Sequence, residues 1–178
     1  NGIAKHLGNI GNVYNQEGDY VKELDYYLKA LKLDEELKNK TGIAAKLGSI
    51  GIVYKKQGQH AKALDFYLEA LKMEQELENK NNIAAWLGSI GVVYADLAKE
   101  NTHKPEKDSL FGIALDYYFR SLKLNEKLGN KIGIAKQMGN IGWLYTTIGR
   151  FTEAEDYLLK TLNVYREIGA KDGERRIE

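Results

Sequence analysis

The chain has 178 residues, no cysteine, and 26 lysine and arginine residues against 25 aspartate and glutamate residues, for a formal net charge of +1 at pH 7. This near balance argues against a nucleic-acid-binding protein, because such a protein needs a concentrated basic face to neutralise phosphates. The absence of cysteine excludes disulfides, thiolate nucleophiles and cysteine-ligated zinc, and no apolar run approaches the roughly 18 residues of a membrane-spanning helix.

Four copies of one sequence pattern follow each other along the chain. Each copy has an Ile-Ala pair and, eleven residues after the isoleucine, a tyrosine; the pairs begin at Ile3, Ile43, Ile83 and Ile134. Their spacings are 40, 40 and 51 residues, so the third copy carries 11 extra residues. Such internal repetition is typical of repeat architectures. It predicts a single array with repeats at 1–40, 41–80, 81–131 and 132–169, and a partial fifth unit or capping helix at 170–178.

Each repeat has the pattern of two helices joined by a turn. In the first repeat, one apolar row at helical spacing is followed by a second row, formed by Ile3, Leu7, Ile10 and Tyr14 and then by Leu24, Leu28 and Leu31. Gly18 lies between the two rows, where glycine can adopt the left-handed conformation that ends a helix. We expect an all-α fold with helices of roughly 17 residues, the second running to about Lys38.

The 11 extra residues lie near 99–109, between the two expected helices of the third repeat, and include the only proline, Pro105. Insertions in repeat arrays map to loops, sometimes on the binding face. The segment is therefore expected to be either a solvated loop or a contact loop within an interface.

The repeated positions match a known signature. The four copies read Leu7, Ile10, Gly11 and Tyr14 with Glu23 and Tyr27; Leu47, Ile50, Gly51 and Tyr54 with Ala63 and Tyr67; Leu87, Ile90, Gly91 and Tyr94 with Ala114 and Tyr118; and Met138, Ile141, Gly142 and Tyr145 with Ala154 and Leu158. This resembles the tetratricopeptide repeat, W-x2-L-G-x2-Y followed by A-x3-F. The resemblance implies a right-handed α-solenoid of four helix–turn–helix repeats.

Two features depart from the family pattern. The period is 40 residues instead of 34, and the family's closing proline is replaced by Glu35, Gln75, Glu126 and Arg166. In these respects the chain resembles the long-period arrays of kinesin light chains, cell-polarity adaptors and bacterial signalling proteins. Because the first residue is Asn1, we expect the chain to be a segment of a larger protein.

Glycines and aromatic residues recur at fixed places in the first helices. Gly11 and its equivalents match the small residue where the two helices of a tetratricopeptide repeat approach most closely. A second series of glycines also recurs in the first helices, at Gly8, Gly48, Gly88 and Gly139. Either these glycines allow neighbouring first helices to approach closely, or they form the floor of a groove. Tyr14, Tyr54, Tyr94 and Tyr145 are expected in the core, since aromatic residues at helical spacing usually lie there.

The sequence offers no candidate catalytic centre. His6, His60 and His103 fall in different repeats, and no two histidines have metal-ligand spacing. Asp25 and Asp65 recur on second helices, where we expect a solvated outer face. We therefore predict that the chain is not an enzyme and binds no metal or cofactor.

The resemblance implies that a ligand lies on the concave surface, lined by first-helix positions outside the apolar row. Carried over by register, the expected groove residues are Lys5, Asn9, Asn12 and Gln16; Ser49, Ile52, Lys55 and Lys56; Ser89, Val92 and Asp96; and Lys136, Asn140, Trp143 and Thr147. The same register also places Asn15, Ala45, Ala85, Ala95 and Thr146 there. Trp143 is expected to face the groove, the alternative being that it covers a neighbouring helix.

Two functions are consistent with this pattern. The first is a non-catalytic scaffold that binds a peptide or protein segment in the groove. The second is a structural or oligomerising sensor segment of a bacterial signalling protein, which would act through its ends and convex face. In either case the partners are proteins and not nucleic acid or membrane, weak homo-oligomers through the array ends are expected, and a soluble, cytoplasmic protein is favoured.

Overall fold

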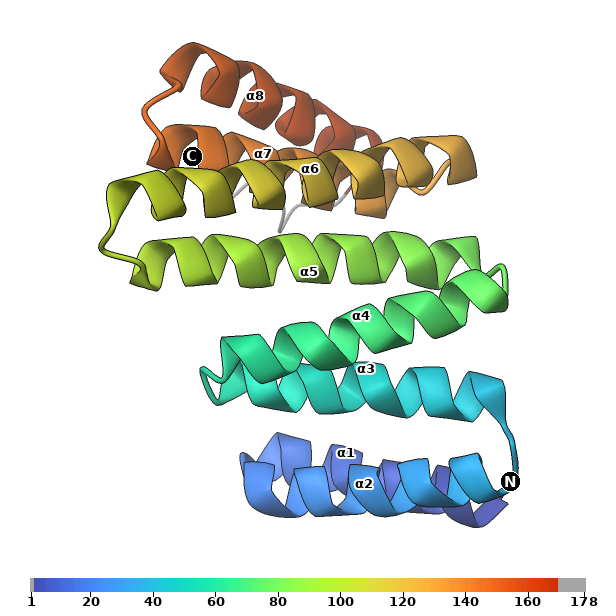
Figure 1. Ribbon diagram of the computed structural model, residues 1–178. Coiled ribbons are helices and arrows are strands. Elements are labelled where there is room, and N and C mark those ends of the chain that lie inside the picture. The colour runs from blue at the N-terminus through green and yellow to red at the C-terminus, as the bar shows by residue number, and fades with distance from the viewer. Residues whose placement is uncertain (1, 170–178) are drawn as a thin grey trace. The chain divides into compact units, whose positions relative to one another are not determined.

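The computed structural model describes residues 2–169, which form eight α-helices and no strand (Figure 1). The helices are α1 (Gly2–Glu17), α2 (Tyr20–Glu36), α3 (Lys40–Lys56), α4 (His60–Glu76), α5 (Lys80–Glu100), α6 (Lys104–Leu128), α7 (Lys131–Thr147) and α8 (Phe151–Glu167). The predicted all-α fold of helix pairs is confirmed. The chain divides into two compact units between Asn79 and Lys80, so unit 1 holds α1–α4 and unit 2 holds α5–α8. The predicted fifth unit at 170–178 lies outside the described residues, and the right-handed twist stays a prediction.

Three of the turns inside the helix pairs depend on glycine. Gly18, Gly58 and Gly149 have φ angles of 74°, 71° and 80°, a left-handed conformation that costs glycine no steric penalty. The next residue then donates its backbone N–H to a tyrosine carbonyl of the first helix, as Asp19 does to Tyr14 at 3.0 Å. This is the predicted way of ending the first helix.

A buried polar contact forms the junction between consecutive pairs. Asn39 caps α3 by accepting the Gly42 N–H at 3.2 Å, and its amide donates to Asp34 on α2 at 2.6 Å. Asp34 is 3% exposed. In unit 2, Asn130 makes the equivalent contacts with Gly133 and Asn125, at 3.1 and 2.8 Å.

The same junction lies close to Gly42 and to the end of α2. A Cβ at Gly42 would lie 2.4 Å from the Asp34 carboxylate, so a larger residue there would displace the side chains of the junction. Helix α2 ends at Glu36, with Leu37 as its C-cap and Lys38 in a left-handed φ of 52°, close to the predicted end at about Lys38.

Close contact between the two helices of each pair occurs at the predicted glycines. A Cβ at Gly11, Gly51 or Gly91 would come within 2.6–2.7 Å of the ring of Tyr27, Tyr67 or Tyr118, and one at Gly142 would lie 2.8 Å from Leu158. The second glycine series has no single packing role. A Cβ at Gly88 would meet Gln137 where α5 and α7 contact each other, whereas one at Gly8 would meet only the end of the Lys46 side chain and one at Gly139 would make an ordinary contact with Thr161 of α8.

The aromatic core differs from the predicted one. The most deeply buried tyrosines are Tyr27, Tyr67 and Tyr118 of the second helices. Tyr14, Tyr54 and Tyr94 are only half-buried, and their rings stack on Tyr26, Phe66 and Tyr117 at centroid distances of 5.3–5.6 Å. Of the four predicted core tyrosines, only Tyr145 is buried, at 7% exposure. Helical spacing identified the inward side of the first helices but not how deeply each ring is buried.

The 11 extra residues are solvated but do not form the expected loop. They lengthen α5 to 21 residues and α6 to 25, and only 101–103 connect the two helices. Pro105 lies in the first turn of α6, where a missing N–H removes no intrahelical hydrogen bond. Ala98 and Phe111, at the two ends of the insertion, are buried in the core of unit 2.

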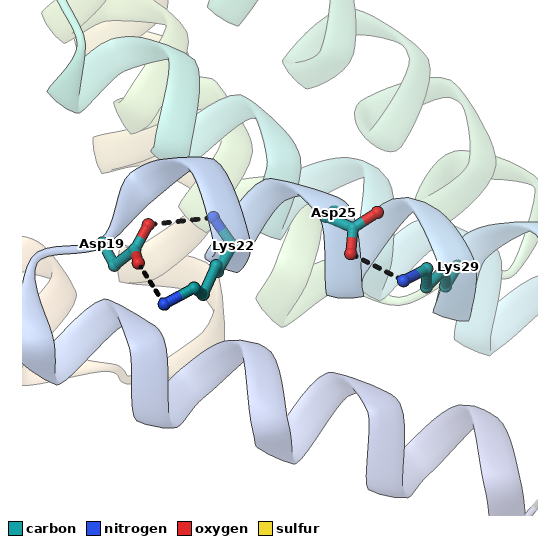
Figure 2. A network of polar contacts seen from close by, with 4 residues as sticks. All are labelled: Asp19, Lys22, Asp25 and Lys29. Carbon is teal, nitrogen blue, oxygen red and sulfur yellow. Dashed lines mark hydrogen bonds and ion pairs between the residues drawn. The ribbon is translucent and has the colours of Figure 1, made fainter.

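Asp19, the residue before α2, and three charged residues of α2 form local pairs, as Figure 2 shows. Asp19 accepts the Lys22 N–H at 3.1 Å and pairs with the Lys22 ammonium at 3.0 Å, and Lys29 pairs with Asp25 at 2.7 Å. The backbone hydrogen bond from Lys22 is the largest cause that lowers the pKa of Asp19. Asp25 thus belongs to a solvated face, as expected, and exposed pairs of this kind contribute little to stability.

We predict opposite effects for two glycine-to-alanine changes. Gly51→Ala should lower the free energy of unfolding by about 2 kcal/mol, because the added methyl group overpacks against Tyr67 and outweighs the gain in helix propensity. Gly112→Ala is the matched control, since a Cβ there meets nothing within 4 Å in the exposed middle of α6. It should raise stability by about 1 kcal/mol. Urea unfolding measures both, and equal effects would contradict the close-approach interpretation.

Candidate functional site

In unit 1, α1 and α3 carry the predicted groove residues outside the core. Ser49 and Lys55 are half-buried and the others are exposed, namely Lys5, Asn9, Asn12, Gln16, Ile52 and Lys56. Ile52 is an exposed large apolar residue of this face. Near its edge, Lys5 and Lys46 line a pocket of about 260 Å³ together with the start of α3. The face therefore offers amide, ammonium and apolar groups to a partner.

Asn12 also has a structural task. Its side-chain oxygen accepts the hydroxyl of Tyr27 at 2.6 Å. Burial raises the pKa of Tyr27 to about 12, and the negative charge of Glu23 acts in the same direction. Glu23 is 1% exposed and accepts the side-chain amide of Asn15. This polar cluster fixes the orientation of Asn12 and Asn15 on the face of unit 1.

In unit 2, the predicted residues lie on α5 and α7, which contact each other directly. Lys136, Trp143 and Thr147 are exposed, whereas Ser89, Val92, Asp96 and Asn140 are half-buried. The register also predicted Ala95 on this face. That prediction is wrong, because Ala95 is buried and belongs to the core of unit 2.

Trp143 lies outside the core and next to a lysine. Its side chain is 43% exposed, and the Lys99 ammonium lies 4.0 Å from the centre of its ring. The same ammonium is 3.1 Å from a carboxylate oxygen of Asp96. Sequence reasoning missed Lys99 because it placed the residue in a loop, whereas the longer α5 carries it to α7.

The insertion also contributes to a pocket beside this cluster. A cavity of about 370 Å³ is lined by Thr147 and Ile148 at the end of α7 and by insertion residues, including Thr102, Lys104 and Lys107. Thr147 is one helical turn from Trp143 and donates its hydroxyl to the Trp143 carbonyl at 3.0 Å. Among the described residues, Trp143 and this pocket therefore adjoin on one side of α7.

Within residues 2–169, no group of three or more histidine, aspartate or glutamate side chains is arranged to hold a metal ion. None of the eight helices is long and apolar enough to cross a membrane. The charged side chains of the two faces can form hydrogen bonds and ion pairs with a partner.

The sequence matches two family models, both for the tetratricopeptide repeat. One matches residues 2–76 and 42–101, and the other matches residues 134–168. The chain belongs to the tetratricopeptide repeat family. No curated protein matches the sequence.

Several solved structures share the fold of this tetratricopeptide repeat chain. BtubC (BKLC) from P. vanneervenii has a TM-score of 0.75 and 18% identity, over 97% of this chain and 76% of BtubC. Aspartyl phosphate phosphatase F from Bacillus subtilis has a TM-score of 0.84 at 14% identity, and a Rap protein complexed with Competence and Sporulation Factor has 0.82 at 16%. The alignments cover 98% of this chain but only 43% and 46% of those two proteins. At these identities the likeness shows the α-solenoid fold alone.

We predict that Asn12 stabilises unit 1 through Tyr27. Asn12→Ala should lower the free energy of unfolding by about 1 kcal/mol, because the buried hydroxyl loses its acceptor. In a Tyr27→Phe background the same change should cost nearly nothing. Asn9→Ala, an exposed position on the same helix, is the control and should be neutral in both backgrounds. A cost for Asn12→Ala that is independent of Tyr27 would refute the assignment.

Proposed function

We propose that this chain is a non-catalytic scaffold that binds a peptide or protein segment on the exposed face of its first helices. The observation that carries the proposal is Trp143, a large aromatic residue that is 43% exposed on α7 among polar neighbours. Tryptophan is enriched among the residues that dominate binding energy at interfaces. An exposed tryptophan contributes little packing to the core, and its indole can pack against a bound partner.

Three further observations support binding and not catalysis. The family's repeats stack to create extended surfaces suited to protein partners. A Rap protein of similar fold has been solved in complex with Competence and Sporulation Factor. Two of the histidines have local partners: His6 bonds to the Gly2 carbonyl of its own helix, and His103 precedes α6 beside Glu106.

The direct test selects ligands from a random peptide library displayed on phage, with the immobilised protein as bait. We expect recovery of peptides that bind in solution and are displaced by changes on the first-helix face. If no peptide binds, or if binding is insensitive to every change on that face, the proposal is wrong.

Substitutions at Trp143 and at Tyr145, two residues later, should have different effects on peptide binding and on stability. Trp143→Ala should cost less than about 1 kcal/mol of stability and weaken peptide binding about tenfold or more. Tyr145→Ala should cost about 3–5 kcal/mol, because it empties a buried aromatic position against Tyr157, 5.7 Å away. Phe151→Ala, an exposed aromatic on α8, is the control and should leave peptide affinity unchanged. Thermal unfolding and calorimetric titration measure the two effects.

A second candidate function is self-association within a larger signalling protein. On α8 of unit 2, Phe151 and Leu159 are 69% and 54% exposed and line a pocket of about 330 Å³ with Ala154 and Leu158. Exposed apolar patches of this kind mark interaction sites or aggregation-prone surfaces. We propose that a second copy of the chain covers this patch.

Sedimentation velocity over a hundredfold concentration range tests self-association. We expect the average mass to rise with concentration and the double variant Phe151→Ser, Leu159→Ser to stay monomeric, because it removes apolar area from the patch. Trp143→Ala should not alter the mass. A monomer at every concentration would contradict this second function and leave the peptide-binding proposal unaffected.

A further inference from the structure

We infer that Asp96 and Trp143 form a binding subsite for an arginine or lysine side chain, which the protein's own Lys99 occupies in this structure. The Lys99 ammonium lies 4.0 Å from the Trp143 ring centre and 3.1 Å from the Asp96 carboxylate. A cation over an aromatic face and beside an anion is the arrangement that a basic ligand side chain would adopt. The inference rests on the proposed function, because it names the ligand chemistry of the same face.

The two walls of the subsite come from different helices. Asp96 lies on α5 and Trp143 on α7, and the repeat register predicts both as groove residues. Tryptophan is the strongest of the aromatic side chains in binding cations. A guanidinium group can stack flat on the indole and bond the carboxylate at the same time, so we expect arginine to bind better than lysine.

The position of Lys99 allows a ligand cation to replace its ammonium between Asp96 and Trp143. Lys99 lies in the last turn of α5, directly before the connection at 101–103, and its side chain is 44% exposed. Its ammonium can therefore leave the indole and become hydrated without disturbing the core. The Asp96 side chain is 24% exposed, so a ligand cation competes with Lys99 for a partly buried carboxylate.

The inserted segment supplies this internal competitor. Helix α3, the equivalent of α5 in unit 1, has 17 residues, whereas α5 has 21. The added turn contains Lys99. In the second repeat the chain has already turned into α4 at the corresponding place, around His60. The insertion therefore supplies the group that occupies the subsite, whereas Asp96 and Trp143 form its walls.

The experiment uses the two tryptophans as reporters in ¹⁵N-labelled protein. N-acetyl-arginine amide is titrated into wild type and Lys99→Ala, and the indole N–H signals are followed by NMR. We expect a saturable shift of the Trp143 signal in both proteins, with a midpoint about fivefold lower in Lys99→Ala, because the competing cation is gone. The Trp86 signal, on α5, should not move. Lys99→Ala combined with Asp96→Asn should lose at least the gained affinity.

Two controls isolate the charge and the position. N-acetyl-citrulline amide has nearly the shape of the arginine probe but no charge and should give no saturable shift. Lys160→Ala removes a lysine that pairs with Asp156 and lies 5.5 Å from the Tyr157 ring, and it should leave the Trp143 titration unchanged. The inference is overturned if Lys99→Ala shows no saturable Trp143 shift with arginine amide, or if citrulline amide binds equally well. If selected peptides still bind in that case, only the subsite is wrong and the scaffold function stands.

Discussion

The contact between a glycine of each first helix and a bulky side chain of its partner helix is the constraint on which the rest of the structure depends. At Gly11, Gly51 and Gly91 the space of a Cβ atom is taken by a tyrosine ring, and at Gly142 by Leu158. Glycine in a helix interior costs about 1 kcal/mol relative to alanine, so the packing must outweigh that cost in every pair. It sets the rotation of each first helix and thereby decides which side remains exposed to a partner.

Polar residues complete this arrangement at the junctions between pairs. A buried side chain near the end of α2 or α6 holds the asparagine that caps the following helix, as Asp34 holds Asn39 and Asn125 holds Asn130. Buried polar groups need such partners, because an unsatisfied one costs about 1–3 kcal/mol. The junction thus specifies where the next helix begins without the proline that ends the shorter repeats of this family. A Cβ at Gly42 or Gly133 would meet this junction at 2.0–2.4 Å, which favours glycine directly before the Ile-Ala pair in the second and fourth repeats.

Helix order, turns and the inner glycines were predictable because each depends on local spacing repeated four times. The depth of burial was not, since Tyr14 and Tyr145 occupy the same place in the repeat but differ in their surroundings: Tyr14 stacks on Tyr26, whereas Tyr145 packs in the core near Tyr157. The insertion was misread because its single proline suggests a loop, although proline is well tolerated in the first turn of a helix. Asn12, Ile52 and Trp143 are exposed, and their role in a groove stays a prediction. The hydrogen bond from Tyr27 to Asn12 joins two helices and could not be predicted from the spacing of residues within one helix.

The 11-residue insertion changes the chemistry of the exposed face of unit 2, because it contains Lys99, which was not predicted as a site residue. A loop of the same length would place its ammonium in solvent, where it would have no fixed partner. Because the segment is helical, the last turn of α5 carries Lys99 beside Asp96, three residues earlier, and over the Trp143 ring of the neighbouring first helix. Asp96 on α5 and Trp143 on α7 hold this lysine. Each of these helices is positioned by its glycine contact with the second helix of the same repeat. The chemistry of the exposed face of unit 2 therefore follows from two features acting together: the regular packing of the repeats and the single irregular segment inserted into it.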